Sequence, residues 1–186
     1  LLAAAAATGH APRPSAAPEA VKWNATDSTL ALQALLDAGA AGGVVHVPAK
    51  PSPWVVAPIG RNRTAIWLRH DHQTVVFEPG CEVVARRGAP FYLKPAVLFR
   101  AESVHNVTLI GHGATFRMWK DDYFHPPYCT PPCVHDEFRM TLSFYTSSSI
   151  TILGLTFFGS GGDGIFMTGC RDVRIDGVLS QYNARQ

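Results

Sequence analysis

Asp163 stands among glycines, in the run Ser-Gly-Gly-Asp-Gly at residues 160–164, directly before the apolar residues 165–167. Glycine allows sharp backbone turns, so this run predicts a bend that exposes one carboxylate beside a strand. A carboxylate on a rigid sheet face can act as a general acid or base, or bind a cation or a sugar hydroxyl. The alternative is an Asx turn, in which the Asp side chain only caps its own backbone.

Arg139 lies before Asp163 and Arg185 after it, each at a distance that suits one turn of a repeating fold. If successive turns stack about 4.8 Å apart, the three side chains form a row. Guanidinium groups bind carboxylates through two parallel hydrogen bonds, so the row suits an acidic or polyhydroxyl substrate. Glu137 is the obvious second carboxylate for hydrolysis, which requires two. A structural Arg–Asp ladder is the alternative. Two further residues of this region are candidate substrate contacts, Asn183 and Gln186.

The segment 119–137 interrupts the repeat and is rich in proline, which disfavours a regular element. It predicts a projecting loop that carries polar side chains, as binding loops do. Its candidate substrate-binding residues are Trp119, Asp122, Tyr123 and His125. In lyase or epimerase chemistry, Tyr123 or His125 would exchange a proton while Arg139 or Arg185 stabilises the developing anion.

Cys129 and Cys133 lie in the same loop, between His125 and His135. A local disulfide is the favoured interpretation, and we expect no metal. A zinc site and free thiols are the alternatives. Cys81 and Cys170 lie near strand ends, and buried core cysteines are favoured there over a second bridge.

The elements that must position these residues follow from a repeat. Residues 149–157 and 172–180 share one pattern of alternating apolar and polar residues, a Gly, and a return to apolar residues. Such units bury their apolar faces only when they stack. Related segments at 106–116 and 74–84 and a first strand at 42–48 extend the series. The sequence therefore predicts an all-β fold, a right-handed parallel β-helix (solenoid). Its stacked parallel strands should begin near Val44, Val75, Val107, Ile150 and Val173.

A helix over residues 29–38 is expected to cap this solenoid, with Asp27 or Ser28 at its start and Gly39 at its end. Residues 1–22 resemble a signal-peptide remnant or a disordered leader. We expect residues 23–186 to be the N-terminal part of a β-helix domain that is truncated at its C-terminal end. Asn24 and Asn62 begin glycosylation sequons, which together with the leader favour a secreted or extracellular protein.

Composition narrows the partners of this 186-residue chain, whose formal net charge is +2. So small a charge, without a basic run, argues against nucleic acid and against an anionic membrane surface. No apolar stretch is long enough to span a membrane. Nothing in the sequence indicates a cofactor.

The start of the domain, at residues 42–48, is similar to that of the pectate-lyase superfamily, including its rhamnogalacturonase and epimerase-like group. The segments at 137–139, 160–164 and 183–186 resemble a Glu-Trp-Arg, Gly-Gly-Asp-Gly and Asn-x-Arg-Gln series of right-handed parallel β-helix repeat proteins, with Phe138 in place of the Trp. The resemblance implies a carbohydrate-active β-helix but does not fix the reaction, which could be that of a lyase, an epimerase or a glycoside hydrolase. The polygalacturonase pattern of paired aspartates fits poorly.

Two functions are therefore open. The first is an enzyme that acts on a polysaccharide or oligosaccharide, uronate-containing ones included. The second is a non-catalytic glycan-binding or surface scaffold protein, with Trp119, Tyr123 and Tyr128 as platforms for sugar rings.

Overall fold

The structure, a computed structural model, describes residues 22–39, 42–59, 63–88, 91, 95–129, 131, 133 and 137–184. The expected leader lies outside the described residues except for Lys22, and so do Asn62, Arg185 and Gln186.

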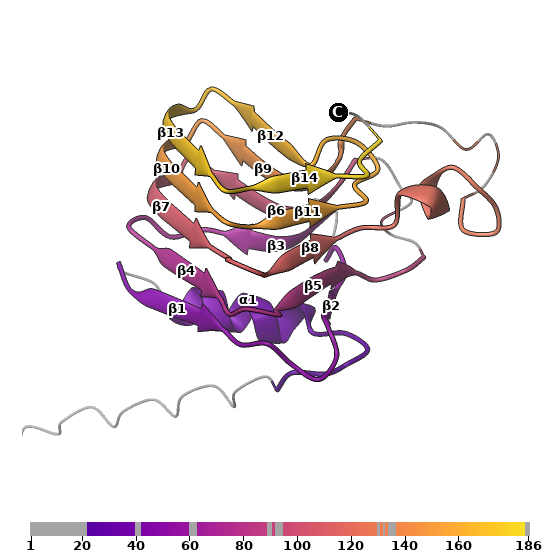
Figure 1. Ribbon diagram of the computed structural model, residues 1–186, viewed down its shortest axis with the longest axis horizontal. Coiled ribbons are helices and arrows are strands. Elements are labelled where there is room, and N and C mark those ends of the chain that lie inside the picture. The colour runs from indigo at the N-terminus through magenta and orange to yellow at the C-terminus, as the bar shows by residue number, and fades with distance from the viewer. Residues whose placement is uncertain are drawn as a thin grey trace, which may run out of the picture.

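Three parallel sheets make up the body of the molecule (Figure 1). Sheet A contains β1 (Val44–Val47), β4 (Thr74–Phe77), β7 (His105–Ile110), β10 (Ser148–Leu153) and β13 (Arg171–Asp176). Sheet B contains β2 (Trp54–Val56), β5 (Glu82–Ala85), β8 (Thr115–Arg117), β11 (Thr156–Phe158) and β14 (Leu179–Gln181). Sheet C contains β3 (Thr64–Leu68), β6 (Ala96–Glu102), β9 (Arg139–Tyr145) and β12 (Ile165–Thr168). The chain visits A, B and C in turn, so neighbours within a sheet are three strands apart in sequence.

This arrangement corrects the expected fold class. The described residues form a multi-sheet parallel β fold, with sheets of five, five and four strands and one α-helix, rather than a single closed β-helix (solenoid). The sequence repeat detected only the strands of sheets A and B, because residues 149–157 span β10 and β11 together. The strands of sheet C lie in segments without that pattern. The predicted parallel stacking of the repeat strands is confirmed, with Val107 opposite Ile150 and Ile150 opposite Val173.

The helix α1 (Thr29–Ala38) forms where it was expected and contacts β1, β2 and β3. Asp27 Oδ1 accepts hydrogen bonds from the Thr29 N–H and Oγ1, which satisfies an otherwise free donor of the first turn. Leu32 and Leu36 are buried in the core. The amide of Gln33 bonds both the N–H and the carbonyl of Trp67, which ties α1 to β3.

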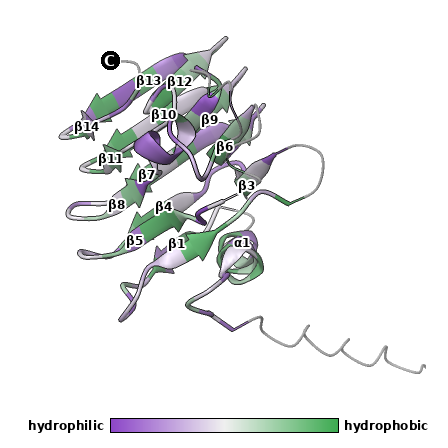
Figure 2. Ribbon diagram, turned by 90° about the vertical axis from the view of Figure 1, so that its right-hand side faces the viewer, coloured by the Kyte–Doolittle hydropathy of each residue, from purple (hydrophilic) through white to green (hydrophobic). Residues whose placement is uncertain are grey.

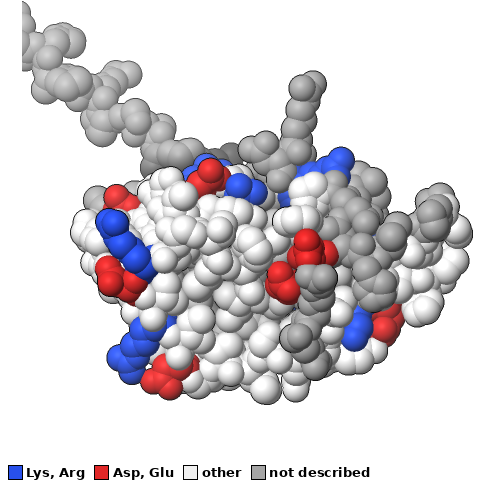
Figure 3. All heavy atoms as spheres, turned by 90° about the horizontal axis from the view of Figure 1, so that it is seen from above, with Lys and Arg blue, Asp and Glu red and all other residues white. Residues whose placement is uncertain are grey.

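The core fills the space between the sheets with inward-facing apolar side chains, which are alternate residues in strands such as β1, β4 and β7. Aromatic rings stack along it, with Phe99 and Phe116 4.3 Å apart between centroids. Figure 2 shows the apolar residues along the strands. Val173 and Ile175 of β13 are 40% and 46% exposed, although their partners Ile150 and Ile152 are fully buried. Seen from that end, most of the visible face is uncharged, with basic groups toward its edge and acidic groups both at its edge and nearer its middle (Figure 3).

The corners of the fold differ in length. Short turns join sheet A to sheet B and sheet C to sheet A, whereas the corner from sheet B to sheet C carries the connections 57–63, 86–95, 118–138 and 159–164. The longest of them includes the 3₁₀ helix η1 (Lys120–Tyr123) and projects beyond the sheets (Figure 1). In the described part of the chain, no helix is long and apolar enough to cross a membrane. The B–C corner is therefore where loops can build a site.

Candidate functional site

Hydrogen bonds connect the Ser-Gly-Gly-Asp-Gly turn to the segment that contains Arg139 and to the segment that contains Asn183. Gly162 N donates to Arg139 O at 2.9 Å, and Thr141 N donates to Asp163 O at 3.2 Å. From the following turn, Asn183 Oδ1 accepts from Ser160 N at 2.9 Å. The expected alignment of these segments on successive turns is thus present in their backbones. The side chain of Asp163 is half-buried.

Arg139 and Tyr123 lie inside the protein, only 3% and 0% exposed. The Arg139 guanidinium is 5.2 Å from the centroid of the Tyr123 ring, a cation–π arrangement. A Cβ on Gly161 would lie 2.3 Å from Tyr123 Cδ2, so only glycine leaves room for this packing. Both side chains are therefore placed to support the corner from within.

An open pocket lies beside this cluster, where β8, β11 and β14 end against η1. Its volume is about 210 Å³, and we call it the η1 pocket. Among the described residues, ten line it: Arg87, Arg117, Met118, Trp119, Lys120, Asp121, Asp122, Phe158, Gly159 and Tyr182. It contains two of the expected substrate-binding residues, Trp119 and Asp122.

Arg87 fixes one wall of the η1 pocket. Its Nε lies 2.8 Å from Asp122 Oδ2 and its Nη2 lies 3.2 Å from Asp122 Oδ1, a two-pronged ion pair. The same guanidinium lies 4.3 Å from the Trp119 ring and 5.2 Å from the Tyr128 ring. The side chain of Asp122 is 9% exposed and that of Arg87 is 50% exposed. Arg87 thus connects η1 and the following loop to the end of β5, with half of its side chain open to a ligand.

The opposite wall is a stack of rings and cations. The rings of Phe158 and Tyr182 are stacked at 5.3 Å between centroids. The Arg117 guanidinium lies 4.8 Å from the Phe158 ring, and Lys120 Nζ lies 4.6 Å from the Tyr182 ring. Arg117 also pairs with Glu82 at 2.6 Å, and Lys120 Nζ donates to the carbonyl of Asn183 at 3.2 Å.

The Tyr182 hydroxyl donates to Asp121 and lies 3.0 and 2.9 Å from its two carboxylate oxygens. This hydrogen bond and the charge of Asp121 raise the pKa of the Tyr182 phenol above its ordinary value. The phenol therefore stays protonated at neutral pH. The pocket offers hydrogen-bond donors, acceptors and apolar ring surfaces together, which is the requirement for holding a polar, ring-shaped ligand.

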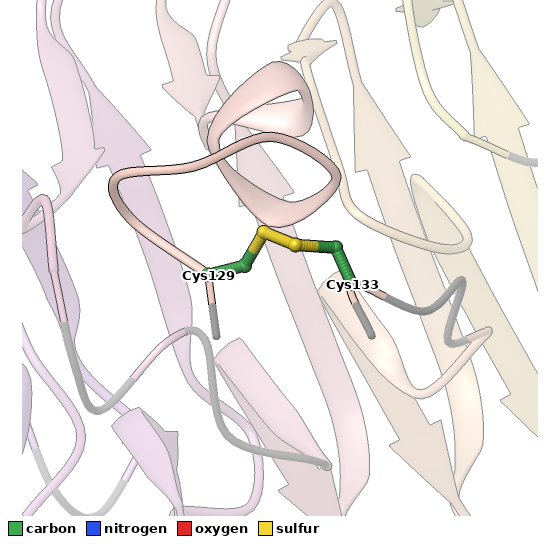
Figure 4. Close-up of a disulfide and its surroundings, with 2 residues drawn as sticks. All are labelled: Cys129 and Cys133. Atoms are coloured by element: carbon green, nitrogen blue, oxygen red, sulfur yellow. A yellow bond between two sulfur atoms is a disulfide. The ribbon is translucent and has the colours of Figure 1, made fainter. Parts of the chain in front are cut away.

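The cysteine loop lies next to the wall that contains Arg87, because Tyr128, the neighbour of Cys129, contacts the Arg87 guanidinium. Cys129 and Cys133 form a disulfide, drawn in Figure 4. Since a disulfide removes both thiolates, it disfavours the zinc alternative. Cys129 is buried, whereas the neighbouring His125 is exposed. Cys81 is buried and free, and burial together with Glu78 and Glu82 raises the pKa of its thiol to about 12.

Two other sequence-based candidates, Glu137 and Asn183, are hydrogen-bonded to the same turn, whereas Asn24 lies outside it. Glu137 is half-buried, and its carbonyl accepts a long hydrogen bond of 3.5 Å from Asp163 N. Asn183 is buried and bonds the turn rather than facing outward. Asn24 is exposed, and its amide oxygen accepts from Thr26 N and Oγ1.

Sequence reasoning missed Arg87, Arg117, Phe158 and Tyr182. Phe158 and Arg117 lie on the outer face of sheet B in adjacent register, a pairing that the repeat itself implies. Arg87 and Tyr182 leave no comparable signal, because loops of irregular length carry them to the pocket.

Comparison with known proteins gives little beyond the fold. No family model matches the chain, and no curated protein matches it. A solved structure from Parabacteroides merdae ATCC 43184, named a "putative glycosyl hydrolase", is similar over 86% of this chain and 69% of its own length. The TM-score is 0.63 and the sequence identity 14%. At that identity the likeness shows a shared fold.

Proposed function

We propose that this protein is a secreted, carbohydrate-active protein that binds a polysaccharide in the η1 pocket. The observation that carries the proposal is the composition of the pocket, in which rings, cations and carboxylates surround one open space. Sugars present apolar ring faces and many hydroxyl groups, so a sugar site combines aromatic surfaces with hydrogen-bonding groups. The fold of a protein named a "putative glycosyl hydrolase" supports the same class of ligand.

Uronate-containing polysaccharides are the substrates that we favour. Arg87, Arg117 and Lys120 place three cationic groups around the pocket, and a guanidinium binds a carboxylate well. A cation beside a uronate carboxylate would also stabilise the anion that forms when a base removes the C5 proton, as in lyase or epimerase chemistry. Asp163 and Asp121 are candidate proton-transfer groups, and hydrolysis would need two such carboxylates.

A non-catalytic glycan-binding protein is the second candidate. It is favoured by the pairing within the pocket, where Asp122 is bound to Arg87 and Asp121 to Tyr182. Carboxylates held in this way suit stable binding.

The deciding experiment incubates the full chain with polygalacturonate, alginate, rhamnogalacturonan and neutral glucans. Binding is measured by affinity electrophoresis, and reaction is followed as absorbance near 235 nm and as new reducing ends. Unsaturated products indicate a lyase, and reducing ends alone indicate a hydrolase. Uronate epimerisation is followed separately by NMR. Binding without any product favours the scaffold, and no binding to any polymer contradicts the proposal.

Secretion rests on two observations. The Cys129–Cys133 disulfide suits an oxidising compartment, and the Asn24 sequon is exposed. Expression through a secretory pathway should add an enzyme-removable glycan that Asn24→Gln eliminates. The resemblance to the pectate-lyase superfamily stays a prediction.

A further inference from the structure

Tyr182 has a left-handed backbone conformation, as do several other turn residues such as His72 and Thr146. Tyr182 follows β14 directly, at the place where Gly159 follows β11, and Gly159 N bonds Gln181 O between the two turns. Gly159 has φ of 72° and Tyr182 has φ of 57°, both in the left-handed region. Glycine adopts this conformation readily, whereas a bulky side chain is a genuine outlier there.

Packing does not account for this tyrosine. Its side chain is 45% exposed, so it contributes little to the core. The contacts that hold it are the Phe158 ring, Lys120 and Asp121, and all three line the η1 pocket. Strained residues that their surroundings fix in place are concentrated at binding sites.

We infer that Tyr182 and Asp121 form the edge of the η1 pocket that recognises adjacent hydroxyl groups of a pyranose residue. The inference rests on the proposed function and names the part of the site that makes this contact.

The hydrogen-bonding capacity of the pair supports this assignment. The phenol uses its proton toward Asp121, which leaves its oxygen free to accept a sugar hydroxyl. Asp121 retains lone pairs that can accept a second hydroxyl. Lys120 has three N–H donors, and the Asn183 carbonyl takes one of them. Because the pKa of Tyr182 is raised, its phenol keeps this proton at neutral pH.

The test compares Tyr182→Gly with the wild-type full chain, using polygalacturonate and its 2,3-O-acetylated form as probes. Glycine relieves the left-handed strain, so the melting temperature should stay level or rise. Affinity for polygalacturonate should fall about tenfold or more, the scale of one lost hydrogen bond together with a lost ring contact. Acetylation of the sugar should weaken binding to the wild type much more than to the variant.

Two further variants keep the test decisive. Tyr182→Phe retains the ring and should lose affinity without losing the fold, so it serves if the glycine variant does not fold. Thr146→Gly is the control. Thr146 also has a left-handed backbone conformation and an exposed side chain, but it lies in the turn after β9, so this change should leave binding unchanged. Affinity within twofold of wild type in both Tyr182 variants overturns the inference while the proposed function stands. A wild-type chain that binds none of the polymers of the panel overturns both.

Discussion

The B–C corner contains two regions with the same pairing of arginine and aromatic ring, and they differ in exposure. In the buried cluster, Arg139 lies over Tyr123 and both are inside the protein. In the η1 pocket, Arg87 lies over Trp119 with half of its side chain exposed. The buried pair stabilises the corner, and the exposed pair can still contact a ligand. The residue types alone therefore do not reveal which of the two regions can bind a ligand.

The two regions also contain different candidate carboxylates. Asp163 belongs to the turn beside the buried cluster, whereas Asp121 is exposed at the mouth of the η1 pocket. Three experiments test this division, and a fourth concerns the helix α1.

The largest effect is expected for Tyr123→Ala. Removing a fully buried aromatic side chain should lower the free energy of unfolding by about 3–5 kcal/mol. Tyr128→Ala, at a 41% exposed ring, is the control and should cost less than about 1 kcal/mol. Denaturant titration measures both. Equal losses in the two variants would contradict the distinction between buried and exposed regions.

Asp163→Asn tests chemistry at the turn. If the panel of polysaccharides identifies a substrate, its turnover by this variant should fall about 10²-fold or more, the scale expected when general acid–base catalysis is lost. Affinity and folding should stay unchanged. Asp172→Asn is the control, since Asp172 is exposed in β13 and asparagine tolerates its left-handed backbone. Unchanged turnover in Asp163→Asn would exclude that carboxylate from the mechanism.

Arg87→Ala tests the exposed pair. It leaves the largely buried Asp122 without this cation and removes the contacts of Arg87 with Trp119 and Tyr128. The affinity for polyuronides should therefore drop about tenfold, and the free energy of unfolding should fall by about 1–2 kcal/mol. Arg86→Ala is the matched control. The Arg86–Asp27 pair is exposed on both sides and should contribute less than about 1 kcal/mol. Titration calorimetry and thermal unfolding give the two readouts, and equal affinities in the two variants would remove Arg87 from the site.

The smallest effect concerns pH at α1, away from both regions. Burial raises the pKa of the Asp27 carboxyl, but hydrogen bonds from Thr29 and the charge of Arg86 outweigh burial, so the pKa lies below its ordinary value. This contribution is complete above the unfolded pKa of about 3.9 and is lost as pH falls through the folded value. Asp27→Asn should therefore cost less than about 1 kcal/mol at pH 7, and its melting temperature should approach that of wild type as the pH falls through the lowered pKa of Asp27. A difference that grows at low pH would reverse the sign of this linkage.

Much of the framework could be predicted from the sequence alone. Alternating apolar residues predicted the strands of sheet A, and those of sheet B except β2, together with their parallel stacking, because only one face of each strand can be buried. The helix over 29–38 and the pairing of Cys129 with Cys133 were also expected from local pattern and spacing. Such features depend on neighbours along the chain.

The third sheet and the pocket depended on tertiary structure. Strands such as β9 contain buried residues on both faces, Met140, Thr141, Leu142 and Ser143 among them, and so lack the alternation that marks a strand in sequence. The glycines around Asp163 looked like a means of exposing a carboxylate, yet Gly161 makes room for the Tyr123 ring. Arg87, Lys120 and Tyr182 meet only because stacked turns bring the ends of β5, β8 and β14 to one corner, and loop lengths in sequence do not encode that proximity.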